Sequence, residues 1–153
     1  MIQAKNISIA TVRREIEASA EELFDAWLDP ASLAVWMRPG GILSSTAKVD
    51  PYEGGAFEIV MHSAEGPIIH TGSYRVIDRP RRLVFTWISP ATGQTETLVS
   101  VEFHAGYRTT EIVVVHEKSP PDAFYSYTKG WRDAIELLAQ KMATERTSKS
   151  ATR

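Results

Sequence analysis

Histidines are the side chains in this sequence best suited to metal binding or acid–base catalysis, and there are four of them. His62 and His70 flank one short turn, so their spacing alone would allow them to hold a metal ion between them. The strand register that gathers the neighbouring apolar residues on one face sends these two side chains to opposite faces of the sheet. We therefore expect no metal site. We expect His70 to point inward beside Met61, either as a hydrogen-bonded structural residue or a residue of the cavity rim, or as a ligand contact.

Carboxylates are the second group with the right chemistry for catalysis. Glu58 and Glu102 lie in the strand-rich middle of the chain, but the strand pattern places both on the solvent face, where they cannot converge as an acid–base pair. The sequence has no nucleophile motif, no phosphate-binding loop and no helical zinc motif. It also has no cysteines, and therefore no thiolate ligands. These patterns predict neither a catalytic residue nor a cofactor.

A larger set of apolar, mostly aromatic side chains is expected on the inner face of a sheet and on the facing stripe of a helix. These candidate ligand-binding residues are Trp36, Phe57, Met61, His70, Tyr74, Phe85, Trp87, Val99, Phe124, Tyr127 and Trp131. Each of them can simply fill a core. Together they are also typical of a small-molecule pocket, which is mostly apolar with a few polar groups, here supplied by His70, Tyr74 and Tyr127.

One long amphipathic helix over residues 119–146 must position the last members of this set. Ser119 can cap its first turn, and Asp122 follows three residues later, where a carboxylate can reach back to the cap. The apolar residues of the helix recur in steps of three and four, at Phe124, Tyr127, Trp131, Ile135, Leu138 and Met142. Residues 147–153 contain no large apolar side chain and are expected to form a disordered tail.

The rest of the chain predicts strands and two short helices. β-Branched and aromatic residues concentrate in seven runs, over residues 5–17, 43–50, 56–62, 68–77, 83–89, 96–104 and 109–117. The connections between the last six runs are too short for parallel crossovers, so the strands should be antiparallel. Ser19 and Glu22 form a capping box for a first helix, and Pro30 can begin a second one.

The alternation of side chains predicts which strand residues meet. Matching the apolar residues across neighbouring strands, we expect Val101 opposite Ile112. The same matching places Tyr74 opposite Trp87 and Val76 opposite Phe85. We also expect two glycines, Gly72 on the inner face and Gly130 on the helix, to leave a gap between sheet and helix. That gap would be a cavity, with Tyr74, Trp87 and Trp131 along its wall and His70 and Trp36 nearer its mouth.

Length, composition and charge limit the number of domains and the kinds of partner that this protein can have. The chain has 153 residues, of which 43% are hydrophobic, enough for a single domain over residues 1–146. The formal net charge of -2 does not favour a nucleic-acid partner. No run is apolar and long enough for a signal peptide or a membrane span, so a cytoplasmic monomer or homodimer is expected.

Several short motifs also occur in a characteristic order between residues 11 and 138. They are residues 14–19 running into 23–30 and 33–36, then 50 with 54–57, then 72–74 leading to 80–87, then 109–111 with 113–116, and finally 130–131 with 137–138. In this order and spacing the sequence resembles the bacterial relatives of the C-terminal domain of the Hsp90 ATPase activator, within the START-like, polyketide-cyclase-like (SRPBCC) superfamily. It departs from that family at Tyr52, where a basic residue is common, and at Tyr127, where a histidine is common.

The resemblance implies an α+β helix-grip fold. In this START-like domain a curved antiparallel sheet of about seven strands wraps around the long C-terminal helix, two short helices follow the first strand, and an apolar cavity lies between sheet and helix. Members of the superfamily bind lipids, hormones or polyketides, and a minority catalyse reactions. Fold-level resemblance does not select among these activities.

Three functions therefore stay open. The first is non-catalytic binding of a small apolar or amphipathic molecule in the cavity. The second is a protein-interaction role like that of the chaperone activators, for which the chain offers apolar Val113 and Val115 on the outer face of a strand. The third is a cyclase- or hydratase-type enzyme, which would have to recruit polar groups such as His70, Tyr74, Tyr127 and Arg14.

Overall fold

The computed structural model describes residues 8–119 and 123–151, apart from the side chains of residues 8, 124, 125 and 147–151. Within these ranges the chain forms seven strands, three α-helices and one 3-10 turn. In chain order they are β1 (Ser8–Ile16), α1 (Ala20–Ala26), α2 (Pro30–Trp36), β2 (Ser44–Val49), β3 (Ala56–Ser63), β4 (Gly66–Asp78), β5 (Arg82–Trp87), η2 (Pro90–Thr92), β6 (Thr97–Ala105), β7 (Thr110–Ser119) and α3 (Phe124–Ala151).

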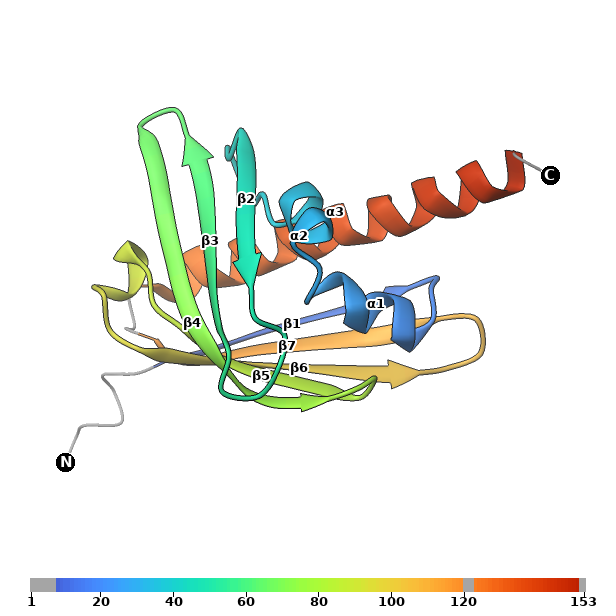
Figure 1. The fold of residues 1–153 in the computed structure, drawn as a ribbon, viewed down its shortest axis with the longest axis horizontal. Coiled ribbons are helices and arrows are strands. Elements are labelled where there is room, and N and C mark those ends of the chain that lie inside the picture. The colour runs from blue at the N-terminus through green and yellow to red at the C-terminus, as the bar shows by residue number, and fades with distance from the viewer. Residues whose placement is uncertain (1–7, 120–122, 152–153) are drawn as a thin grey trace.

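All seven strands belong to one antiparallel sheet in the order β1-β7-β6-β5-β4-β3-β2. The sheet is strongly bent (Figure 1): β2 and β3 stand upright against the part formed by β1, β7, β6 and β5, and α3 runs through the angle between the two parts. The predicted helix-grip fold is confirmed. A sheet with one apolar face must bury that face against another element, and α3 with the two short helices supplies the cover.

The two short helices begin where the sequence predicts. Ser19 Oγ accepts a hydrogen bond from the Glu22 backbone N–H at 3.1 Å, and Glu22 Oε1 accepts one from the Ser19 N–H at 3.0 Å. This reciprocal pair is a complete capping box for α1. Pro30 occupies the first turn of α2, where the missing N–H costs nothing, and α2 buries Leu33 and Trp36.

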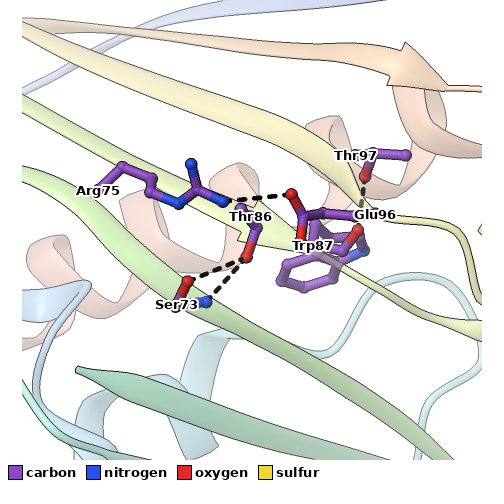
Figure 2. Close-up of polar contacts among 6 residues, drawn as sticks. All are labelled: Ser73, Arg75, Thr86, Trp87, Glu96 and Thr97. Atoms are coloured by element: carbon purple, nitrogen blue, oxygen red, sulfur yellow. Dashed lines mark hydrogen bonds and ion pairs between the residues drawn. The ribbon is translucent and has the colours of Figure 1, made fainter. Parts of the chain in front are cut away.

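The bend of the sheet is concentrated where β4 approaches β5. Ser73 donates its backbone N–H to Thr86 Oγ1 at 2.9 Å, so a side chain replaces the usual strand carbonyl (Figure 2). A register shift follows between Tyr74 and Val76, and an irregularity of this kind sharpens local twist. A Cβ on Gly72 would lie 1.9 Å from the Thr86 carbonyl oxygen and 2.6 Å from the Phe57 ring. Only glycine permits this close approach of the two strands.

Both register predictions on these hairpins were wrong. Tyr74 pairs with Phe85 instead of Trp87, because the bulge in β4 displaces the ladder. Val101 pairs with Val114 instead of Ile112, because pairing continues to Ala105 and Thr110, so that the four-residue turn lies at 106–109 instead of 105–108. A shift of two residues preserves the alternation of faces. Val99, Val101, Ile112 and Val114 are therefore buried as predicted.

Val76, the other residue of the first hairpin, pairs with Val84 instead of Phe85 and is only half-buried, so it does not belong to the inner face. The expected apolar outer surface on β7 is also smaller than predicted. Val113 is buried, and Val115 is half-buried. Gly72 leaves no gap between sheet and helix, because the Phe57 ring already occupies the space in front of it.

The boundaries of α3 differ from the expected helix. Ser119 is the last residue of β7, and residues 120–122, which were expected to form the first turn, lie outside the described residues. At the other end α3 continues to Ala151, five residues beyond the expected end of the helix at Arg146. No glycine or proline follows Arg146, and nothing in the sequence therefore ends the helix there. Among the residues that the structure describes, no helix combines the length and apolar character of a membrane span.

Replacing Gly72 with alanine tests the close approach of β4 and β5. We expect Gly72→Ala to lower the free energy of unfolding by about 3 kcal/mol, because the added methyl overlaps backbone and ring atoms that cannot both move away. Gly106→Ala is the matched control, since a Cβ there lies at an ordinary 3.5 Å from the Thr109 carbonyl oxygen. Urea unfolding of both variants measures the difference. Equal stability of the two would refute the steric argument.

Candidate ligand-binding cavity

A cavity of about 420 Å³ lies between α3, the β3–β4–β5 part of the sheet and the segment that follows α2. It is lined by Met37, Pro39, Gly40, Ile42, Met61, Ile68, His70, Trp87, Ser89, Ala91, Ser126, Tyr127, Lys129, Gly130, Trp131, Asp133 and Ala134. Lys129, whose side chain is 72% exposed, is part of the wall, so the cavity reaches the molecular surface. Its volume falls in the range typical of small-molecule sites.

Five of the candidate residues come together on this wall. They are Met61 from β3, His70 from β4, Trp87 from β5, and Tyr127 and Trp131 from α3. Gly130 also lines the cavity, and a Cβ at that position would meet only Pro39, at 3.8 Å. Of the two glycines expected to leave space, Gly130 is therefore the one beside the cavity.

The other candidates lie elsewhere. Phe57, Tyr74 and Phe85 line a neighbouring void of only about 10 Å³, which is room for one water at most. Val99 is fully buried in the core, and the side chain of Phe124 lies outside the described residues.

Trp36 is also fully buried, so its predicted place at the mouth was wrong. The reason is that α2 turns this side chain inward. Its Nε1 donates to the Ala26 carbonyl at 3.2 Å, and its ring lies 4.7 Å from that of Trp27.

A buried hydrogen-bond chain through His116 joins the Trp131 ring to the backbone carbonyl of Trp87. Trp131 Nε1 donates to His116 Nδ1 at 3.0 Å, and His116 Nε2 lies 2.7 Å from Thr97 Oγ1. Thr97 Oγ1 in turn donates to the Trp87 carbonyl at 2.7 Å (Figure 2). An indole nitrogen can only donate and a carbonyl can only accept. His116 therefore carries its proton on Nε2 and donates it to Thr97.

His116 was missing from the candidate residues, although its alternation with Ile112 and Val114 places it on the inner face. It is fully buried in the structure. Burial lowers the pKa of the His116 imidazole to about 3, because the protonated ring would lose its hydration. With both nitrogens engaged, His116 positions its neighbours and offers no free base to the cavity.

His70 has a different environment, because it lines the cavity and its contacts are with backbone carbonyls. The residue is 8% exposed, and its Nδ1 lies 3.3 Å from the Ile59 carbonyl oxygen. Its ring centroid is 5.0 Å from that of Trp87. Burial lowers the pKa of His70, against the opposing effect of the Ile59 and Ile68 carbonyls. The side chain is therefore a neutral imidazole in the cavity wall at neutral pH.

A pair of hydroxyl groups supplies the other buried polar contact of the wall. Tyr127 Oη and Ser89 Oγ lie 3.0 Å apart. Burial raises the pKa of Tyr127, and the hydrogen bond to Ser89 partly offsets that effect. The Trp87 Nε1 is buried beside the same hydroxyl, close enough to influence its pKa but without the geometry of a normal hydrogen bond. Ser89, the N-cap residue of η2, carried no signal in the sequence.

The rim of the cavity is an ion pair on α3. Lys129 Nζ lies 2.7 Å from Asp133 Oδ2, and the same carboxylate oxygen accepts the Gly40 backbone N–H at 3.2 Å. This contact ties the segment after α2 to the helix. The two charges of the rim therefore already compensate each other.

The polar groups proposed for an enzyme do not converge on the cavity. Arg14 forms a two-pronged contact with Glu136 at 3.0 and 3.3 Å, which joins β1 to α3. Tyr74 faces the small void, and burial raises its pKa. His70 and Tyr127 line the cavity. His62 lies on the other face of β3, half-buried, as the strand pattern predicts.

The buried neutral His116 makes stability depend on pH. The unfolded chain binds a proton at this histidine below about pH 6.5, whereas the folded protein does so only near pH 3. The stability that depends on the neutral ring is therefore complete above about pH 6.5. It is lost as the pH falls, at about 1.4 kcal/mol per pH unit.

We expect His116→Gln to reduce the slope of the unfolding free energy against pH by about that amount between roughly pH 4 and 6. Urea melts at several pH values measure the slope. His104→Gln, at an exposed position on β6, is the control for loss of a histidine as such. An unchanged slope in His116→Gln would contradict the assignment of a neutral His116.

Comparison with known proteins identifies the fold and the family. A search of curated proteins finds no match. The solved structure of protein NE0264 from Nitrosomonas europaea superposes with a TM-score of 0.77 at 19% identity, covering 95% of this chain and 99% of that chain. DynU16, encoded in the dynemicin biosynthetic locus, gives 0.74 at 18% identity, covering 90% of this chain and 48% of the other. These two likenesses concern the fold alone.

An Hsp90 activator from Plasmodium falciparum, PFC0360w, is also similar, with a TM-score of 0.58 and 25% identity over 73% of this chain and 74% of its own. The family described as "Activator of Hsp90 ATPase homolog 1-like protein" matches residues 17–143, which is most of the sequence. The chain therefore belongs to the family of Hsp90 ATPase activator homolog 1-like proteins, in the helix-grip fold.

Proposed function

We propose that this protein binds a small apolar or amphipathic molecule in the cavity between the sheet and α3, without transforming it. The supporting observation is the cavity itself. It has a volume of about 420 Å³, it reaches the surface, and aromatic side chains from three separate elements form its wall. Empty apolar space of this size favours an apolar guest over water.

The contacts of the tryptophan rings in the cavity wall explain why the space stays open. The Trp131 ring is tied into the His116 chain through its Nε1, so it cannot fall into the space without breaking a buried hydrogen bond. Breaking such a bond leaves a polar group unsatisfied, at a cost of about 1–3 kcal/mol. The Trp87 ring is held by packing, with ring centroids 5.3 Å from Trp131 and 5.0 Å from His70. A preformed site of this kind spends little binding energy on reorganisation.

A second candidate function is regulation of a chaperone ATPase through direct contact. The family match and the similarity to the Plasmodium activator favour it. The burial of Val113 removes the apolar patch on which the sequence argument for a partner depended. The ATPase rate of an Hsp90-type chaperone, measured with and without this protein, tests the candidate. A rate that stays constant across a saturating titration would exclude it.

Filling the cavity from α3 tests the ligand-binding proposal. We expect wild-type protein to bind the neutral dye N-phenyl-1-naphthylamine with a Kd in the micromolar range, about -8 kcal/mol. Gly130→Leu should weaken binding by about tenfold or more, because the leucine side chain extends from the cavity wall beside Pro39. Dye fluorescence and quenching of tryptophan emission report the binding.

Gly130→Ala is the matched control. Its single methyl fits at ordinary contact distance, and alanine in place of glycine should stabilise the helix by about 1 kcal/mol. Dye affinity should therefore remain close to wild type in this variant. If folded wild-type protein binds no apolar probe, or if Gly130→Leu binds the dye as well as Gly130→Ala does, the cavity is not a ligand site.

A further inference from the structure

The charges around the cavity limit what can enter it. In the described part of the chain, Lys129 is the one cationic side chain on the wall, and it is paired with Asp133 at 2.7 Å. Both belong to the exposed rim, and the carboxylate is held further by the Gly40 N–H. A buried anion or cation would find no uncompensated partner inside. Burial of an unpaired charge costs several kcal/mol, so the interior favours a neutral guest.

His70 adds a requirement for the ligand, namely a hydrogen-bond donor. The Ile59 carbonyl can only accept, so His70 Nδ1, at 3.3 Å, carries the proton of the ring. In a neutral imidazole the other nitrogen, Nε2, then has a free lone pair. Among the described residues no group donates a hydrogen bond to Nε2, and the residue lines the cavity. Burial, which lowers the pKa of His70, keeps this nitrogen an acceptor at neutral pH.

The shape of the wall favours flat rings. The centroids of the His70 and Trp87 rings are 5.0 Å apart, and those of Trp87 and Trp131 are 5.3 Å apart. Tyr127 completes this side of the cavity. Aromatic faces and edges of this kind interact well with a planar aromatic guest, beyond the gain from burial alone.

We propose that the cavity selects neutral aromatic molecules that carry a hydroxyl group, with His70 Nε2 accepting the hydroxyl proton. This inference rests on the proposed function and specifies the class of ligand. The hydroxyl pair of Ser89 and Tyr127, 3.0 Å apart, can receive a further oxygen of such a ligand. His70 is then the residue that distinguishes a phenol from its ether.

Three probes with the same two-ring body test the proposal by isothermal titration calorimetry at pH 7. They are 2-naphthol, 2-methoxynaphthalene and 2-naphthoate. The ether is the more apolar of the two neutral probes, so burial alone would favour it. We expect 2-naphthol to bind about three- to tenfold more tightly than the ether, which is the effect of one net hydrogen bond. We expect its affinity to exceed that of the anionic 2-naphthoate by about tenfold or more.

The role of His70 is tested by His70→Phe, which keeps a ring of similar size but has no acceptor. The preference for 2-naphthol over its ether should disappear in this variant. His62→Phe, the same substitution on the opposite face of the sheet, should retain it. Nitrogen NMR of wild-type protein gives a second readout that needs no substitution. His70 Nε2 should be unprotonated, and its resonance should move with 2-naphthol but not with the ether.

The possible failures are distinguishable. If no probe binds, and N-phenyl-1-naphthylamine does not bind either, the proposed function itself is refuted. If the three probes bind equally, or if 2-naphthoate binds most tightly, the cavity binds ligands but the inferred class is wrong. A folded His70→Phe that keeps the naphthol preference, or a wild-type Nε2 that carries the proton, would refute the assigned role of His70.

Discussion

The buried hydrogen-bond chain from Trp131 through His116 and Thr97 to the Trp87 carbonyl is the interaction on which the cavity depends. It joins α3 to β7, β6 and β5 in one series of donors and acceptors. Each group has only one role left once its neighbour is assigned, so the chain admits a single arrangement. Fully satisfied polar networks of this kind make a core unique as well as stable. Here the network also fixes the Trp131 ring, against which the Trp87 ring packs with centroids 5.3 Å apart.

The bend of the sheet provides the space that this network keeps open. At Gly72 and Thr86 the strands β4 and β5 approach so closely that a side chain is excluded. Beyond this point β3 and β2 turn away from the rest of the sheet (Figure 1). A straight helix cannot fill the angle between two parts of a bent sheet evenly. The cavity occupies that angle, where Gly130 removes one more side chain from the helix face.

Charged residues serve the architecture more than the site. Arg14 with Glu136 joins β1 to α3, and Arg79 with Asp25, at 2.8 Å, joins the turn after β4 to α1. Exposed pairs of this kind are screened by water, so they orient elements more than they stabilise them. Inside the cavity the polar groups are neutral. That separation suits recognition of an uncharged molecule, and it leaves His70 as the acceptor with a free position.

The fold, the family and the inner face of the sheet could be predicted from the sequence, because they follow from local signals. Alternation in β3 placed Phe57 and Met61 inside, and the Ser19 capping box marked the start of α1. Alternation also survives a register error of two residues, which is why the mistaken pairing of Val101 did not change its burial. Five of the eleven candidate site residues line the cavity, because strand alternation and helix periodicity placed them on the inner faces.

Tertiary structure alone decided where the space lies and which polar groups face it. Gly72 appeared to leave a gap, but the space in front of it is taken by Phe57, a residue of another strand. Trp36 appeared to stand at the mouth, but α2 turns it toward Trp27. Ser89 meets Tyr127, and His116 meets Trp131, across separations in sequence that no periodicity reports. Periodicity specifies the face on which a side chain lies, whereas a cavity depends on the distance between faces, which the bend of the sheet sets.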